Sequence, residues 1–172
     1  MSDYTEEIHV VGNHLESLVA EWYELQGYFI RRNVKVGKRP RGGYECELDV
    51  VGFHPEQRSL VQIEPSLDAH TWTKREARYS KKFEAGRKYI PGLFPSMAIP
   101  EEAIDQIALF VYGGKSRDCI AGGRVILIRD FMEEIRAGIR DRRVARAAIP
   151  ERFPLLRTLQ FAAEYWERQE PR

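Results

Sequence analysis

The first clear pattern along the chain is an amphipathic helix that begins at residue 13. Asn13 is a residue type that caps helix starts, and Gly27 supplies the left-handed conformation that ends them. Apolar residues between these two positions recur every three or four residues, which places them on one helical face. The residues of this face are Leu15, Leu18, Val19, Trp22 and Leu25.

Three short strands are predicted after this helix. Residues 28–36 are rich in β-branched and aromatic side chains, residues 46–53 form a second such run, and residues 59–64 form a third that Pro65 halts. Turn-forming residues separate the runs: Lys-Arg-Pro-Arg-Gly-Gly after the first, and a proline-containing segment after the second. Strands joined by tight turns predict an antiparallel meander at the start of a sheet.

The second half of the chain alternates between helical and apolar segments. Residues 71–88 are predicted to form a helix with Trp72, Tyr79 and Phe83 on its inner face. The apolar runs 107–112 and 124–128 each lie next to a pair of glycines and are typical of strands in the interior of a sheet. The remaining segments are a helix at 131–148 with Gly138 as its weak point, a break at Pro150 and Pro154, and a final helix at 155–168.

This order of elements predicts an α/β fold with a mixed central sheet flanked by helices. At 172 residues the chain has the length of one domain. The N-terminus carries acids where a signal peptide carries bases, and no apolar run approaches the roughly 18 residues that span a bilayer. Cys46 and Cys119 offer no disulfide framework. We therefore expect an intracellular, cytoplasmic protein.

Charge is distributed unevenly along the chain, although the net charge is only +1. Residues 1–30 contain six acids and neither lysine nor arginine, whereas bases cluster in 31–41, 74–88 and 136–146. Within the second cluster, Lys74, Arg78, Lys81 and Lys88 recur at helical spacing and form a basic ridge. Any one such cluster is most often a solvated surface, but one face of a nearly neutral protein can still be positive.

Carboxylates occupy unusual positions in two of the predicted strands. Asp49 stands in the middle of a strand between apolar residues, where a charge is costly to bury unless it binds something. Gln62 and Glu64 are two residues apart, so their side chains leave the same face of the third strand. If the second and third strands form a hairpin, Asp49 and Glu64 converge, and Glu16 adds a carboxylate from the first helix. Each alone is more commonly an exposed residue, but together they predict a shared site.

This combination resembles the PD-(D/E)XK superfamily of nucleases, including its Mrr-type and resolvase-like members. The resemblance rests on a helix glutamate, the segment ELDVVG, the strand VQIE and a basic helix, and it covers roughly residues 10 to 90. It implies a restriction endonuclease-like αβββαβ core, here about residues 10–130 of a single nuclease-like domain (1–172), with a helical extension at about 131–172. By position, Asp49 matches the main metal ligand, Gln62 the second motif residue, which is also glutamine in Mrr-like members, and Glu16 the helix acid.

The third motif position departs from the family, because Glu64 stands where a lysine is usual. Glu16, Asp49 and Glu64 together would carry a charge near −3, which favours hard divalent cations such as Mg²⁺ or Mn²⁺. Two bound metals could then replace the lysine's contribution. Alternatively, Lys81 or Lys82 could reach the site from the following helix.

The resemblance implies a metal-dependent endonuclease that hydrolyses phosphodiester bonds, with DNA favoured over RNA, in defence or repair. Glu16, Asp49 and Glu64 would hold the metal, Gln62 would complete the catalytic set, and Glu64 could serve as general base. Lys74, Arg75, Arg78, Lys81 and Lys82, together with the glycine-rich loop 37–43, would contact phosphates. A symmetric homodimer would cut both strands of a duplex most simply. The alternatives are an inactive relative of the same fold that binds nucleic acid or a protein, and a small scaffold or antitoxin-like subunit.

Overall fold

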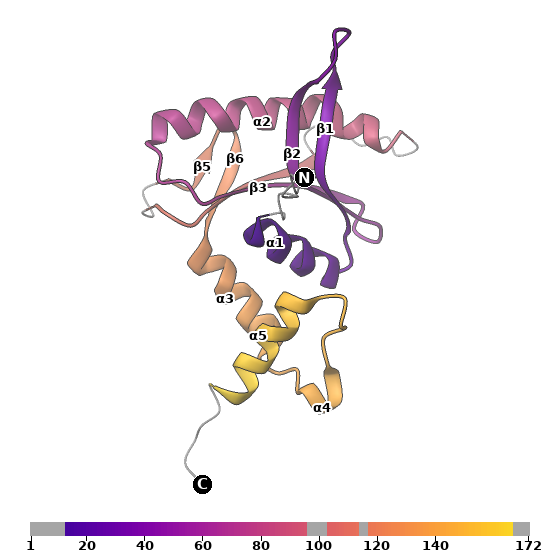
Figure 1. Ribbon diagram of the computed structural model, residues 1–172, viewed down its shortest axis with the longest axis vertical. Coiled ribbons are helices and arrows are strands. Elements are labelled where there is room, and N and C mark those ends of the chain that lie inside the picture. The colour runs from indigo at the N-terminus through magenta and orange to yellow at the C-terminus, as the bar shows by residue number, and fades with distance from the viewer. Residues whose placement is uncertain (1–12, 96–102, 114–116, 167–172) are drawn as a thin grey trace, which may run out of the picture.

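Helices cover both faces of a six-stranded mixed sheet in this α/β protein (Figure 1). The structure, a computed structural model, describes residues 13–95, 103–113 and 117–166. In chain order the elements are α1 (His14–Leu25), β1 (Phe29–Lys38), β2 (Tyr44–His54), β3 (Ser59–Ser66), α2 (Trp72–Leu93), β4 (Ile104–Phe110), β5 (Cys119–Ile120), β6 (Gly123–Leu127), α3 (Ile128–Ile139), α4 (Val144–Ala147) and α5 (Pro154–Tyr165).

The strands lie in the order β1-β2-β3-β4-β6-β5. The first three form the predicted antiparallel meander, β4 runs parallel to both β3 and β6, and β5 closes the edge antiparallel to β6. The α/β class and the mixed sheet expected from the sequence are therefore confirmed. The far end of the β1–β2 hairpin extends past α2, away from the body of the molecule (Figure 1).

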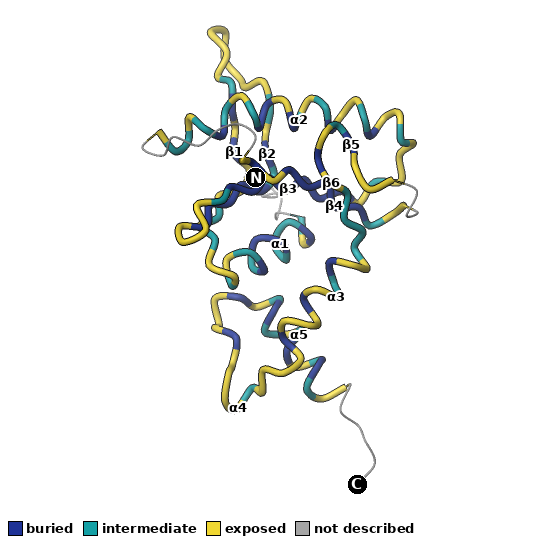
Figure 2. The backbone as a smooth tube through the Cα atoms, turned by 180° about the vertical axis from the view of Figure 1, so that it is seen from behind, coloured by how far each residue is buried: buried dark blue, intermediate teal, exposed yellow. Residues whose placement is uncertain are grey.

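The core is divided by the sheet into an α1 side and an α2 side. Under α1, buried residues of α1, α3 and α5 pack on β2, β3 and β4 around Val19, Ile63 and Leu156. On the other face, α2 packs against the sheet through Tyr79 and Phe83. Figure 2 shows the buried residues following the sheet and the inner sides of these helices. The pattern of apolar residues in the sequence identified both helical faces correctly.

Strand β3 runs through Pro65 rather than ending before it. Its pairing with β2 stops at the Val50–Ile63 pair, whereas its parallel pairing with β4 continues to Ser66. The backbone carbonyl of Ser66 accepts a hydrogen bond from the N–H of Val111, so the backbone of Ser66 faces β4. Because successive residues of a strand face opposite neighbours, the backbone of Pro65 faces the β2 side, where the pairing with β2 has already ended. The missing N–H of the proline therefore removes no bond from the sheet.

The helix predicted at 131–148 is divided into α3 and α4, and the break lies at 140–143 rather than at Gly138. Ile139 and Ile149 are buried in the same cluster under α1. An uninterrupted helix would separate them by about 15 Å, so the chain must turn back to bury both. The break falls on residues 140–143, which are all charged and exposed.

Strand β5 (Cys119–Ile120) was not predicted, and the remaining differences are shifts of element boundaries. The strand predicted at 107–112 begins three residues earlier, at Ile104, and α2 continues past residue 88 to Leu93. Pro154 is the first residue of α5, a position where no backbone N–H is needed. Among the described residues, none of the helices is both long and apolar enough to cross a membrane.

Gly138 permits a close contact between α3 and α1. A Cβ atom at this position would lie 2.5 Å from Cη2 of Trp22, whose indole N–H donates to Glu134 at 3.0 Å. We expect Gly138→Ala to lower the free energy of unfolding by about 1–3 kcal/mol through overpacking. Gly92→Ala is the matched control, because no atom lies within 4 Å of its added methyl group. Urea unfolding should show the control unchanged or stabilised by up to about 1 kcal/mol; equal effects of the two changes would contradict the contact.

Candidate functional site

The site lies where β2 and β3 separate. Their pairing ends at Val50 and Ile63, so Asp49 and Glu64 are the next residues on each strand. The Glu64 carboxylate lies in the opening, where its Oε1 accepts the backbone N–H of Asp49 at 3.4 Å. The sequence prediction that these two acids converge therefore agrees with the structure.

The backbone around Asp49 is locally distorted. Leu48 and Val51 both pack on the α2 side of the sheet while Val50 packs on the α1 side, so the alternation of an ordinary strand is broken here. On the neighbouring strand β1, Asn33 lies between the Arg32–Val50 and Val34–Leu48 pairs and adopts a left-handed φ of 52°. Asparagine adopts this conformation more readily than other non-glycine residues, because its short polar side chain can hydrogen-bond locally.

A lysine from α2 joins the two acids. Nζ of Lys82 lies 2.5 Å from Oδ1 of Asp49 and forms a second ion pair with Oε2 of Glu64. Lys82 was one of two lysines considered for this role from the sequence, and the structure places its ammonium between the carboxylates. Lys81, the other, is exposed and lies outside this cluster. Asp49, Glu64 and Lys82 are referred to below as the carboxylate–lysine cluster.

The cluster is largely withdrawn from solvent. The exposed fraction of the side chain is 0% for Glu64, 13% for Asp49 and 15% for Lys82. Burial raises the pKa of Glu64 to about 8; the Lys82 ammonium opposes this rise, and the charge of Asp49 adds to it. Burial also works against the charge on Lys82, but Glu64 and Asp49 outweigh it and raise the pKa of the lysine. Glu64 therefore exchanges its proton near neutral pH rather than near its usual pKa, next to a lysine that stays charged.

Gln62 lies beneath the cluster and is completely buried. Its Nε2 donates to Oε1 of Glu64 at 2.8 Å and to the backbone carbonyl of Lys82 at 3.1 Å. Its Oε1 accepts from Nε2 of Gln106 at 2.7 Å. Gln62 thus supports Glu64 from the interior of the protein. Gln106 was missed from the sequence because the predicted strand began one residue after it, although a glutamine in an apolar strand is a usable signal.

Glu16 is half-buried on α1, on the other side of the sheet from α2. Burial raises its pKa, and Asp49 raises it further, while Arg32 and Lys82 lower it. Glu16 is therefore within electrostatic reach of the cluster. Among the described residues, however, no group of three or more His, Cys, Asp or Glu side chains is arranged to hold a metal ion. Asp49 and Glu64 form the close pair, and Glu16 stands apart from it.

The basic residues predicted to contact phosphates have different surroundings. Lys74 and Lys81 are exposed on α2, and Arg78 is partly exposed but bonded to Asp68 at 2.6 Å. Arg75 is buried: its guanidinium donates to the backbone carbonyls of Asp68 and Tyr112 at 2.7 and 2.6 Å. These bonds favour a structural role for Arg75, which joins the segment after β3 to the end of β4.

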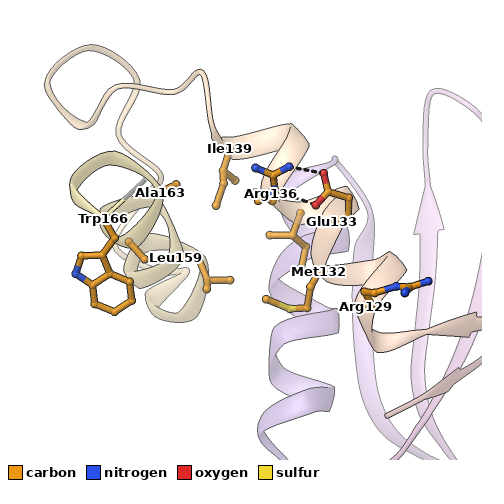
Figure 3. Close-up of a pocket in the computed structure, with 10 residues that line it drawn as sticks. Arg129, Met132, Glu133, Arg136, Ile139, Leu159, Ala163 and Trp166 are labelled. Carbon is orange, nitrogen blue, oxygen red and sulfur yellow. Dashed lines mark hydrogen bonds and ion pairs between the residues drawn. The ribbon is translucent and has the colours of Figure 1, made fainter. Parts of the chain in front are cut away.

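A separate groove lies between α3 and α5, far along the chain from the cluster. It has a volume of about 350 Å³ and is lined by apolar residues with charged residues at its rim. Figure 3 shows Met132, Leu159 and Trp166 around it, and Arg136 bonded to Glu133. None of its lining residues belongs to the carboxylate–lysine cluster.

Comparison with known protein families and curated proteins does not identify the function of this protein. No family model matches the chain, and no curated protein matches it. The function is therefore argued below from the chemistry of the cluster and its surroundings.

Proposed function

We propose that this protein is a metal-dependent nuclease that hydrolyses phosphodiester bonds, with DNA as the favoured substrate, in defence or repair. The observation that carries the proposal is the convergence of Asp49, Glu64 and Lys82 where two strands of the sheet separate. The element order α1-β1-β2-β3-α2-β4 also agrees with the αβββαβ core that the PD-(D/E)XK resemblance implies.

The oxygen atoms of the cluster suit a divalent cation. Asp49 and Glu64 both place an oxygen within ion-pair distance of the same ammonium, so the two carboxylates already share one cationic group. Carboxylate oxygens are the donors that Mg²⁺ and Mn²⁺ prefer. A cation held by Asp49 and Glu64, with Glu16 nearby, would supply Lewis-acid polarisation of a phosphate oxygen and of the attacking water.

Lys82 and Glu64 have distinct parts in the proposed reaction. The Lys82 ammonium would offset negative charge that develops on the phosphate. In the family this is the contribution of the motif lysine, whose position Glu64 occupies here. Glu64, whose pKa is raised, would accept a proton from water at one of its carboxylate oxygens. The lysine thus comes from a helix rather than from the strand that holds the acid.

The surface of α2 gives the substrate a place to bind. Lys74 and Lys81 are exposed on the helix that carries Lys82, and Arg78 lies between them in sequence. Contacts from such residues to phosphates position nucleic acid without reading its sequence. The basic residues near the end of the β1–β2 hairpin, including Arg39 and Arg41, would extend this contact. A homodimer would place two such sites on a duplex.

The first experiment is a cleavage assay with the purified wild-type protein. It uses supercoiled plasmid, linear duplex DNA, single-stranded DNA and RNA, each with Mg²⁺, with Mn²⁺ and with excess EDTA. We expect cleavage of DNA that requires a divalent ion and stops in EDTA. Absence of cleavage from all four substrates, together with absence of Mn²⁺ binding by calorimetry, would contradict the nuclease proposal.

One observation favours a second candidate, an inactive relative that binds nucleic acid or a protein partner. Lys82 pairs with both carboxylates, so the cluster is held together by its own charges. A site of this kind can survive as a structural unit of the fold. Binding of duplex DNA without Mn²⁺ binding or cleavage would identify this candidate.

A further inference from the structure

A chain of side-chain hydrogen bonds leads from the surface of α2 to the carboxylate–lysine cluster. Nη1 of Arg87 donates to Oε1 of Gln106 at 2.6 Å. Nε2 of Gln106 donates to Oε1 of Gln62 at 2.7 Å, and Nε2 of Gln62 donates to Oε1 of Glu64 at 2.8 Å. Gln62 and Gln106 are both buried, and Arg87 is half-buried.

The direction of this chain is determined by groups that cannot reverse their roles. Arginine has no acceptor atom, so Gln106 must turn its oxygen toward Arg87. A backbone carbonyl has no donor, and the carbonyl of Phe83 accepts Nε2 of Gln106 at 2.8 Å. Gln106 therefore presents its NH₂ group to Gln62, which in turn presents its own NH₂ group to Glu64. A carbonyl oxygen of Gln62 facing Glu64 would repel the carboxylate.

Helix α2 lies so close to the two glutamine side chains that they cannot move apart from each other. A Cβ atom at Gly86 would lie 1.7 Å from Oε1 of Gln62 and 3.0 Å from Nε2 of Gln106. The backbone carbonyl of Lys82, one turn earlier on the same helix, accepts a second bond from Gln62 at 3.1 Å. The helix that supplies the lysine therefore also confines the amide that supports Glu64.

We propose that Gln106 and Arg87 are positioning residues: they orient the Gln62 amide so that it donates to Glu64 and holds this carboxylate toward Lys82 and a bound cation. The importance of this orientation for cleavage rests on the proposed nuclease function, but the direction of the chain does not. Partners that orient metal-binding carboxylates typically change metal affinity by about 10–100-fold when they are removed.

Gln106→Glu is the decisive variant, because it replaces the NH₂ group that donates to Gln62 by an acceptor. Gln62 would then turn its own NH₂ group toward residue 106 and its oxygen toward Glu64. The side-chain NH₂ signals of Gln62, recorded by NMR on protein labelled with ¹⁵N-glutamine, should shift away from their wild-type positions. Mn²⁺ affinity, measured by calorimetry, should fall by about 10–100-fold.

Gln160→Glu is the matched control. Gln160 is also buried, accepts the backbone N–H of Ile149 at 2.9 Å, and donates to the carbonyls of Arg142 and Ala147 at 2.9 and 3.0 Å. It should lose stability in the same way as Gln106→Glu, yet leave the Gln62 signals and Mn²⁺ affinity unchanged. Arg87→Met removes only the half-buried end of the chain and should shift the same Gln62 signals. It serves as the test if Gln106→Glu does not fold.

The outcomes separate the two proposals. Shifted Gln62 signals with weaker Mn²⁺ binding support the positioning role. Shifted signals in a protein whose wild type neither binds Mn²⁺ nor cleaves DNA support the chain and contradict the nuclease function. Unchanged Gln62 signals in a folded Gln106→Glu or Arg87→Met variant overturn the positioning role, whatever the activity of the wild type.

Discussion

Asp49→Asn is expected to reduce metal-dependent cleavage by about 10³-fold or more, which is the scale on which loss of a positioned catalytic group acts. The substitution keeps the shape of the side chain but removes the charge that lies 2.5 Å from Nζ of Lys82. It therefore removes one of the two close carboxylates proposed to hold the cation. The measurement is the cleavage rate of plasmid DNA at saturating Mg²⁺.

Asp105→Asn is the control for this experiment. Asp105 also pairs with a cation, Arg124, at 2.7 Å, but it is about half exposed and lies outside the cluster. We expect its cleavage rate to remain within about twofold of the wild type, because exposed ion pairs contribute little. Equal rates for Asp49→Asn, Asp105→Asn and wild type would exclude Asp49 from the site.

Lys82→Met should lower the free energy of unfolding far more than a substitution at an exposed lysine of α2. It leaves the fully buried Glu64 and the nearly buried Asp49 without their shared counter-charge. Removing one member of a buried ion pair typically costs about 3–5 kcal/mol. Lys81→Met, at the exposed neighbouring position, should change the free energy of unfolding by no more than about 0.5 kcal/mol.

The loss caused by Lys82→Met should also depend on pH. Unfolded Glu64 titrates near about 4.3, whereas the folded protein retains this proton to a higher pH because burial raises the pKa to about 8. Between these values the folded state binds more protons than the unfolded state, so its stability falls as pH rises. Without Lys82 the pKa of Glu64 rises further. The difference from wild type should therefore be small at about pH 6, where Glu64 keeps its proton in both folded proteins, and larger at about pH 9, where only the wild-type Glu64 has lost it.

A double variant tests the cause of this effect. In Lys82→Met/Glu64→Gln no charge remains on residue 64, so most of the stability lost in Lys82→Met should return, and the pH dependence should disappear. Urea unfolding of the four proteins at both pH values gives the coupling free energy between the two residues. A coupling close to zero would show that Lys82 stabilises the protein through contacts other than its ion pair with Glu64.

The sequence was informative wherever local chemistry decides structure. The three- and four-residue spacing of apolar residues located α1, and Asn13 accepts the predicted capping bond from the N–H of Leu15 at 3.0 Å. The meander and its turns also followed from local residue preferences. Pro65 misled the prediction, because the effect of a proline on a strand depends on whether a neighbour needs its N–H at that point.

Pairs that are distant in the sequence needed the tertiary structure. Glu64 was identified as a departure from the lysine of the motif, but the choice between Lys81 and Lys82 depends on how α2 is rotated against the sheet. Arg75 and Lys74 are neighbours in one basic run, yet the first is buried and the second exposed. Burial is decided by packing between elements, which a run of like residues does not encode.

The amino-acid sequence alone therefore determined the class of the fold, the meander, and two acids whose strand positions bring them together, because these depend on periodicity and on pairing between adjacent strands. The tertiary structure decided that the strands separate beside those acids, that Lys82 joins them, and that Gln106 supports them from β4. Each of these results from contacts between segments that lie far apart in the chain, where the position of a whole helix or strand, rather than the preference of a residue, determines which side chains meet.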